Sequence, residues 1–214
     1  MDEDLAIINT NTRNEKIKSF FVNNKKKLIT FLLLLVVILL SFFAFKEYKE
    51  IQKKELSDKF NAIIIDYSSQ EKEKTKNELI DIIKKKDSTY SPLSLYFIID
   101  NNLTQDKELV NELFNILIEK TKLEREIKNL IIYKKGLYNA EFESEDNLLN
   151  ILKPLLNSES IWRAHALYLM AEYFYSKGEK KKSKEFFQKI LEIKNVNQNI
   201  FIDAQKRIQR DFSE

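Results

Sequence analysis

Residues 164–190 read AHALYLMAEYFYSKGEKKKSKEFFQKI and carry the clearest structural signal in the chain. Apolar residues recur there at helical spacing on both sides of Gly178, where a glycine suits the positive φ of a turn. The small residues Ala171 and Ser183 would let two helices approach closely, and Phe174 and Phe187 would fill the gaps towards the next pair. The stretch therefore predicts two helices joined by a tight turn.

The rest of the chain after residue 46 follows the same helical pattern, with no sustained alternation of the kind that strands show. Two glycines and two prolines among 214 residues are too few for most β-rich or dinucleotide-binding folds. The predicted helices cover 47–67, 72–86, 91–103, 106–119, 122–140, 144–156, 159–177, 180–194 and 197–211. Short turns between so many helices predict stacked helical hairpins rather than a four-helix bundle.

Three local signals refine these helices. Ser91-Pro92 and Asn157-Ser158 look like helix starts, because a capping side chain or an early proline favours the first turn. Pro154 lies inside an apolar run and is expected to kink or shorten its helix.

Residues 28–45 read LITFLLLLVVILLSFFAF and contain no charge. Eighteen helical residues span about 27 Å, close to the thickness of a bilayer core. The run is longer than the apolar part of a cleaved signal peptide, and no small-x-small cleavage site follows it. We therefore expect an uncleaved transmembrane signal anchor, with 1–27 as a basic tail and 46–214 as a helical domain.

Orientation depends on the basic residues next to this anchor. Lys25, Lys26 and Lys27 adjoin it directly and favour a cytoplasmic N-terminus, and a long downstream domain can cross the membrane whatever its charges. The opposite flank is also basic, at Lys46, Lys49, Lys53 and Lys54, so the charge difference is small. We expect the tail inside the cell and the domain outside the cytoplasm.

Composition argues against several classes of function. The net charge of +3 comes from 36 basic and 33 acidic residues, a balance unlike that of nucleic-acid-binding domains. No cysteine is present, and the single histidine, His165, has no second histidine to complete a metal site. The acidic group at Glu141, Glu143, Glu145 and Asp146 lacks the spacing of a calcium loop. We expect no catalysis, no cofactor and no metal.

The 164–190 stretch also resembles the tetratricopeptide repeat when Ala164 is taken as the first position of a 34-residue unit. The positions that match the repeat pattern are Leu167, Ala171, Phe174, Gly178, Ser183, Phe187 and Ile190. Ser183 stands where alanine is usual, and an earlier unit placed around Phe114 and Leu117 matches weakly. The resemblance implies an all-α fold: a transmembrane helix followed by a right-handed α-solenoid of degenerate tetratricopeptide-like hairpins.

Further residues extend this resemblance. The run 152–156 (LKPLL), the run 161–164 (IWRA), the repeat and a last helix through Ala204 and Ile208 are similar to a bacterial family of membrane-anchored, tetratricopeptide-like ancillary subunits of the Sec translocon. That resemblance implies an inner-membrane protein with a periplasmic domain. It also implies protein partners: the translocon, chaperones and exported polypeptides.

Three functions from different classes remain open. The first is a membrane-tethered protein-interaction module, an accessory of the Sec translocon linking exported polypeptides to periplasmic chaperones, with Tyr168, Tyr173 and Tyr175 lining a groove. The second is an envelope or cell-division assembly scaffold that self-associates through helix 47–67. The third is a membrane-bound hydrolase or small-ligand binder, which needs a closed pocket with convergent polar groups that the sequence does not offer. The sequence identifies neither the partner nor the oligomeric state.

Overall fold

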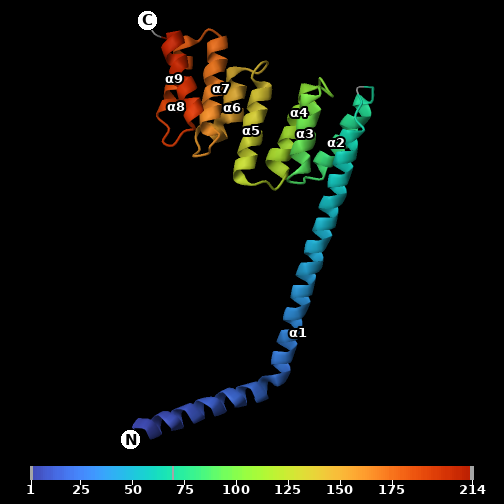
Figure 1. Cartoon of the computed structure of the whole chain (residues 1–214), viewed down its shortest axis with the longest axis vertical. Helices are drawn as coiled ribbons and strands as arrows, with labels where there is room; N and C mark the ends of the chain where they lie inside the picture. Colours follow the sequence, from blue (N-terminus) through green and yellow to red (C-terminus); the bar gives the residue numbers. More distant parts are fainter. Residues whose placement is uncertain (1, 69, 213–214) are drawn as a thin grey trace. The chain divides into compact units, whose positions relative to one another are not determined.

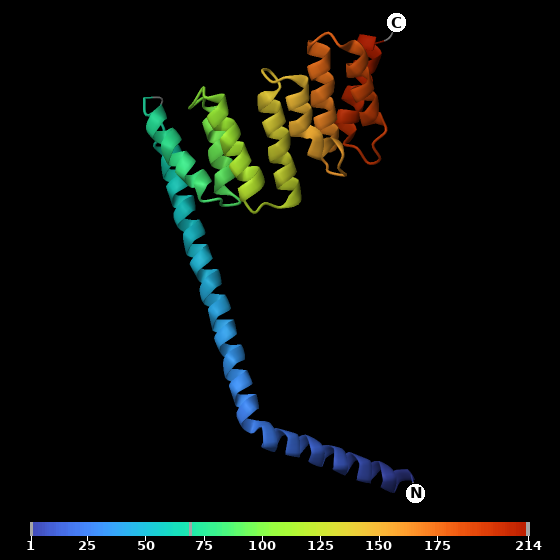
Figure 2. The same cartoon turned by 180° about the vertical axis from the view of Figure 1, so that it is seen from behind.

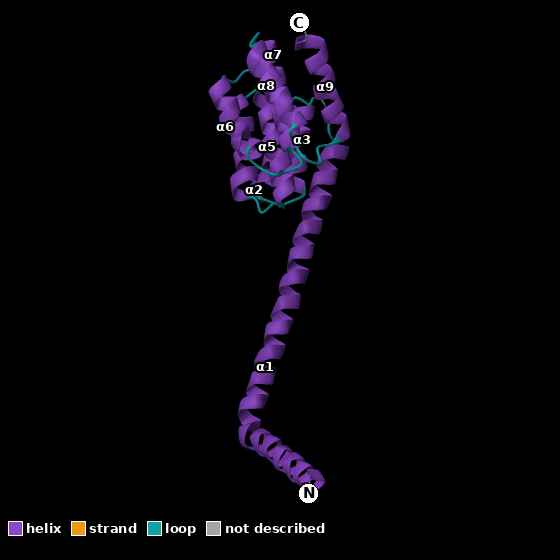
Figure 3. Ribbon diagram, turned by 90° about the vertical axis from the view of Figure 1, so that its left-hand side faces the viewer, coloured by secondary structure: helices purple, strands orange, loops and turns teal. Residues whose placement is uncertain are grey.

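The computed structural model describes residues 2–68 and 70–212, with side chains in the first helix from Glu15 onward. Across these residues the backbone forms helices joined by short loops, and no strand occurs among them (Figure 3). The expected all-α class is therefore confirmed.

The first helix, α1, runs from Asp2 to Ile65 without interruption. The expected tail, membrane stretch and first domain helix are parts of one helix, because no proline or glycine precedes Ile65 to end it. This helix is long and apolar enough to cross a membrane, and its most apolar window is not buried inside the protein. Within α1 the chain divides into two compact units: one ends at Glu55 and the other begins at Leu56, later than the expected position 46.

The second unit contains eight further α-helices and one π-helix among its described residues. They are α2 (Lys72–Lys84), α3 (Tyr90–Asp100), α4 (Lys107–Asn115), η1 (Ile116–Lys120), α5 (Arg125–Asn139), α6 (Glu145–Leu156), α7 (Arg163–Ser176), α8 (Lys180–Leu191) and α9 (Gln198–Phe212). Every helix from α2 to α9 contacts the next one along the chain. They follow one another in chain order in both views, from green α3 to red α9 (Figures 1 and 2).

The predicted helices all exist, but several ends were wrong. Helix α3 begins one residue before Ser91, and its start is capped by the Asp87 carboxylate, which accepts from the backbone N–H of Thr89 and of Tyr90 at 2.8 Å. The Ser91 hydroxyl is buried and donates instead to Ile82 O at 3.1 Å. Sequence could not separate the two roles, because Asp and Ser are both good caps.

Two further differences concern the start of α7 and the end of α4. Helix α7 begins at Arg163 rather than at 159, because the Ser158 and Ser160 hydroxyls accept from backbone N–H groups and close a turn there. The helix expected over 106–119 changes after Asn115 into the π-helix η1.

Three consecutive hydrophobic cores stabilise the second unit. The first joins the end of α1 to α2, α3, α4 and the start of α5, the second joins α5, α6 and α7, and the third joins α7, α8 and α9. Phe60 and Ile63 of α1 are buried in the first core, so the C-terminal end of α1 packs as part of the second unit.

Helix α7 separates the second core from the third. Ala166, Met170 and Phe174 pack into the second core, while Leu167 and Ala171 pack into the third. A helix that is apolar on all sides is normally buried on all sides, and the sequence of α7 has that character. The α7 and α8 helices meet where the 164–190 stretch predicted a hairpin.

Candidate functional site: a groove on either side of α6

Helix α6 presents a buried apolar face and an exposed face rich in asparagine. Leu148, Leu152 and Leu155 are fully buried. The exposed face carries Asn147, Asn150, Pro154 and Asn157, spaced three, four and three residues apart, which places all four on one side of the helix axis. We call these four residues the α6 stripe.

The helix starts where the sequence predicts. The Ser144 hydroxyl accepts from the Asn147 backbone N–H at 3.3 Å, as a capping residue does. The acidic residues Glu145 and Asp146 lie in the first turn, where the helix dipole favours negative charge.

The expectation that Pro154 shortens its helix was wrong, because α6 continues past it to Leu156, the end predicted from the apolar pattern. Proline has no N–H, so the carbonyl of Asn150 lacks the donor that a helix normally provides four residues later. The exposed face of α6 therefore carries one backbone acceptor without its helical partner, in the middle of the α6 stripe.

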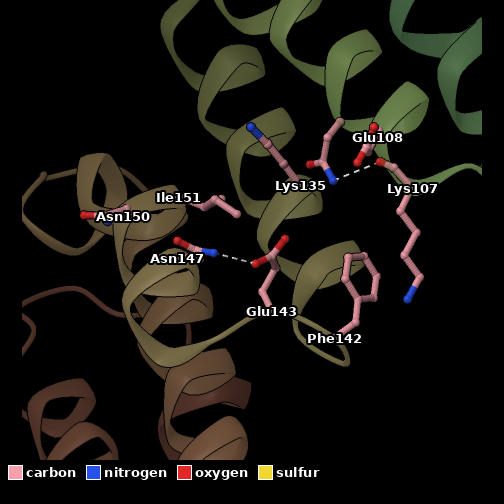
Figure 4. Close-up of a pocket in the computed structure, with 9 residues that line it drawn as sticks. Lys107, Glu108, Lys135, Phe142, Glu143, Asn147, Asn150 and Ile151 are labelled. Carbon is pink, nitrogen blue, oxygen red and sulfur yellow. Dashed lines mark hydrogen bonds between the residues drawn. The ribbon is translucent and has the colours of Figure 1, made fainter.

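A hollow of about 490 Å³ lies on one side of α6, between it and helices α4 and α5. It is lined by Lys107, Glu108, Asn111, Lys135, Phe142, Glu143, Asn147, Asn150 and Ile151. Figure 4 shows Asn147 and Glu143, both of which line this hollow, pointing towards one another, and the Asn147 amide donates to Glu143 Oε2 at 2.8 Å. Lys107 Nζ lies 3.8 Å from the centre of the Phe142 ring, a cation–π contact at its rim.

Asn111, which lines the first hollow, belongs to a pair of amides that joins α4 to α5. Asn111 of α4 and Asn139 of α5 each donate to the other's side-chain oxygen at 2.9 Å, and Asn139 is fully buried. Asn139 also donates to Lys135 O at 2.7 Å, so its amide group has partners for both its oxygen and its nitrogen. A buried amide satisfied in this way fixes the position of α4 against α5.

Lys135 is a half-buried cation in the same hollow. Its ammonium group donates to Asn115 Oδ1 at 2.7 Å. Burial lowers the pKa of Lys135, and the charges of Glu119 and Glu143 oppose that shift only in part.

A second hollow, of about 360 Å³, lies on the other side of α6, between it and helices α7 and α8. It is lined by Leu149, Asn150, Lys153, Leu156, Asn157, Arg163, Leu167, Phe186 and Lys189. Lys189 Nζ lies 4.5 Å from the centre of the Phe186 ring, so this hollow also has a lysine over an aromatic ring. Asn150, in the middle of the α6 stripe, lines both hollows.

The three tyrosines predicted to line a groove lie elsewhere. Tyr173 is buried in the second core and its hydroxyl donates to Glu143 O at 3.2 Å, so its ring is not open to a partner. Tyr168 is half-buried and packs edge-on against Phe187 at 5.2 Å. Tyr175 lies under the Arg207 guanidinium, whose carbon is 4.5 Å from its ring centre. None of the three lines either hollow beside α6.

The seven residues that match the repeat pattern lie on α7, on α8 and in the turn between these helices. Six of them, Leu167, Ala171, Phe174, Ser183, Phe187 and Ile190, are buried. The Ser183 hydroxyl donates to Ala171 O at 2.8 Å, so the two small residues do meet across the α7–α8 contact. Gly178 has a φ of +79° in the turn between these helices, as its position predicted.

A third hollow, of about 880 Å³, lies between the turn before α7 and the turn before α9. His165 lines it and packs against Tyr133 and Trp162, with ring centres 5.7 and 5.0 Å away. Its Nδ1 is buried without a hydrogen-bond partner, as is Nε of the neighbouring Arg163. Acidic and basic side chains both line this hollow, so it has no net preference for an anion or a cation.

Two further features of the charged side chains can be placed in the structure. No group of three or more potential metal ligands occurs among residues 15–68 and 70–212. In the lysine-rich first turn of α8, Lys182 pairs with Glu145 and with Glu179 at 2.8 Å, so this cation is used within the fold.

The α6 stripe is the feature that sequence reasoning missed. The sequence predicts an effect of Pro154 on helix shape only, and it predicts no role for the asparagines around it. The spacing of the asparagines could have revealed the α6 stripe. Asn147, Asn150 and Asn157 all lie on the polar face of a helix whose apolar face is clear from the sequence. Comparison of the chain with protein-family models, curated proteins and solved structures finds no match.

Proposed function

We propose that this chain is a membrane-anchored protein-interaction module that binds extended polypeptide segments along α6. The observation that carries the proposal is the pair of open hollows beside α6, which share Asn150 and are lined mainly by amide, lysine and apolar side chains. Such a lining offers hydrogen bonds and apolar contact without a set of groups arranged for catalysis.

The anchor part of the proposal is supported by the polar groups within the apolar stretch of α1. The Thr30 hydroxyl donates to Lys26 O at 3.0 Å and the Ser41 hydroxyl donates to Val37 O at 2.8 Å. Both are therefore satisfied inside the helix, as a lipid environment requires. The large apolar side chains from Phe31 to Phe45 are exposed, which water would penalise and a bilayer would not.

We further infer that α2 to α9 form a right-handed solenoid of degenerate tetratricopeptide-like hairpins. Support comes from the contact of each helix with the next and from the three consecutive cores. In such an arrangement each hairpin packs on its neighbours, and grooves between hairpins become natural binding surfaces.

The partner proposed on the strength of the family resemblance is the Sec translocon together with exported polypeptides and their chaperones. In this proposal the N-terminus is cytoplasmic and the domain is periplasmic, on the outer side of a bacterial inner membrane. A groove that takes extended segments fits a partner chain that has not yet folded.

A specific observation favours this proposal over a scaffold that dimerises through 47–67. Phe60 and Ile63 are buried in the first core, and Leu56 and Ile64 pack against it. Self-association through 47–67 would require a coiled coil, and these residues would have formed the second half of its apolar seam. The exposed apolar residues left in the first half are Tyr48 and Ile51, too few for a stable coiled coil.

The binding proposal can be tested by site-specific photo-cross-linking in native membranes. A photoreactive phenylalanine analogue placed at Asn147 or Asn157 of the full chain should cross-link newly exported polypeptides and translocon subunits. The matched control places the same group at Glu185, an exposed position on α8 that lines neither hollow beside α6. Equal cross-linking at all three positions, or cross-links only to a second copy of this chain, would contradict the proposal.

A further inference from the structure

We infer that α6 binds the main chain of its polypeptide partner, so that the site accepts extended segments of many different sequences. This inference rests on the proposed function and adds the part of the partner that is recognised. It starts from the groups on the exposed face of α6 that have no partner within the protein.

Two amide side chains in the α6 stripe have no hydrogen-bond partner in the described part of the chain, those of Asn150 and Asn157. Asn147 uses one amide N–H for Glu143 and keeps its oxygen as an acceptor. The Asn150 carbonyl adds a backbone acceptor, because Pro154 cannot donate to it. The stripe thus offers donors and acceptors side by side.

This set matches a peptide main chain more closely than it matches any one side chain. A main chain presents alternating N–H donors and C=O acceptors, and an asparagine side chain is an amide that carries both. A hollow lined only by apolar side chains would select a particular large apolar residue of the partner. Both hollows also contain lysine and asparagine side chains, so they do not impose that selection.

The length of the α6 stripe also fits a short extended peptide segment. Asn147 and Asn157 lie ten residues apart, which is about 15 Å along a helix. An extended chain advances about 3.3 Å per residue, so roughly four or five residues would cross the stripe. Successive side chains of an extended segment point to opposite sides. With the main chain over the stripe, they would enter the first and the second hollow in turn.

Two variants test the inference without weakening the fold. Pro154→Ala restores the missing helical N–H and removes the free Asn150 acceptor, and Asn150→Ala removes the central amide. Both put a better helix former into α6, so neither should lower the melting temperature. Each is expected to weaken peptide binding about 2- to 12-fold, the effect of losing one or two modest hydrogen bonds. Glu185→Ala, on exposed α8, is the matched control and should bind normally.

The probes are labelled short peptides that bind the full chain in lipid nanodiscs, followed by fluorescence anisotropy. One has a neutral mixed sequence, a second has the same residues scrambled, and a third carries N-methyl groups on alternate main-chain nitrogens. The inference expects equal binding of the first two, weak binding of the third, and weaker binding of the first by both α6 variants.

Other results separate the inference from the proposed function. Binding of the N-methylated peptide as tightly as the first, or strong discrimination against the scrambled peptide, would overturn main-chain recognition while leaving a peptide-binding module in place. Unchanged binding by Pro154→Ala and Asn150→Ala would overturn it in the same way. No binding of any peptide would overturn the proposed function and the inference together.

Discussion

Gly136 is a buried residue of α5 that permits close approach to α6. A Cβ built on it would meet the Leu152 side chain, with Cγ 2.9 Å away, and Leu152 is fully buried. Because the core around Leu152 leaves that side chain little room to move, an added methyl group would have to displace it. The glycine is therefore a packing requirement of the α5–α6 contact rather than a turn.

The first prediction is that Gly136→Ala lowers the free energy of unfolding by about 1–3 kcal/mol. Leu152→Ala alone should cost about 2–5 kcal/mol because it leaves a cavity. The double variant should cost less than the sum, since the shortened side chain makes room for the new methyl group. Urea unfolding of the four proteins measures this, and strict additivity would show that the two residues do not compete for space.

Gly178 is required for a different reason from Gly136, because its own backbone conformation, rather than a neighbouring side chain, disfavours other residues. Its φ is +79° and no atom lies within 4 Å of an added Cβ. The second prediction is that Gly178→Ala costs about 1–2 kcal/mol through φ alone. Gly178→Asn should cost less and Gly178→Val more, because Asn tolerates a positive φ and β-branched residues resist it. Thermal melts of the three variants give the order, and equal melting temperatures would remove the turn assignment.

At the scale of elements, α9 is held to α7 and α8 by a cluster around Arg207. This side chain pairs with Glu172 at 2.8 Å and with Asp211 at 2.5 Å, and it lies over the Tyr175 ring. Arg210 contacts Asp211 through two further hydrogen bonds of 2.8 and 3.0 Å. Asp211 is thus the carboxylate on which both arginines of the last helix converge.

The third prediction concerns the pH dependence of this cluster. The hydrogen bond from Arg210, helped by the charges of Arg207 and Arg210, outweighs the opposing effect of burial and lowers the pKa of Asp211 below its ordinary 3.8. A depressed pKa contributes stability that is present above pH 4 and is lost as the pH falls through the folded value. Between about pH 5 and pH 2 the melting temperature of the wild type should therefore fall more steeply than that of Asp211→Asn. Parallel slopes would mean that Asp211 does not help to hold α9.

The helices themselves could be predicted because their signals are local. Apolar spacing, Gly178, and the small residues Ala171 and Ser183 all lie within one hairpin, and the structure brings them together as expected. The amide pair of Asn111 and Asn139 could not be predicted, since the partners are 28 positions apart and meet only when α4 and α5 pack. Tyr173 was wrongly expected at a surface, because a tyrosine on an apolar helix can bury its ring and still pair its hydroxyl.

At the scale of the whole molecule, the two compact units should be separable. The fourth prediction is that deletion of residues 1–45 yields a soluble helical protein that melts in one cooperative transition. The physical reason is that the buried side chains of the three cores all come from Phe60 onward. Far-ultraviolet circular dichroism and size-exclusion chromatography measure the result. Aggregation, or a melt without a transition, would show that the N-terminal unit contributes to the fold.

The fifth prediction concerns the orientation that the proposed function requires. In intact spheroplasts of a bacterial host, added protease should digest the domain of the full chain and leave a cytoplasmic control protein untouched. The positively charged Lys25–Lys27 segment next to the apolar stretch is the physical reason to expect this orientation. Digestion only after lysis would place the domain in the cytoplasm and exclude exported polypeptides as partners.

Opposite faces of α7 pack into the second and the third core. Local unfolding of one helix in the C-terminal half of the second unit should therefore disrupt both cores. Release of α7 would expose Met170 and Phe174 on one side and Leu167 and Ala171 on the other at the same moment. Amide hydrogen exchange in native conditions should therefore report α6, α7 and α8 as one cooperative foldon, with similar protection at their most buried amides. Helices α2 and α3 pack in the first core, to which α7 contributes no residue, so they should exchange as a separate foldon.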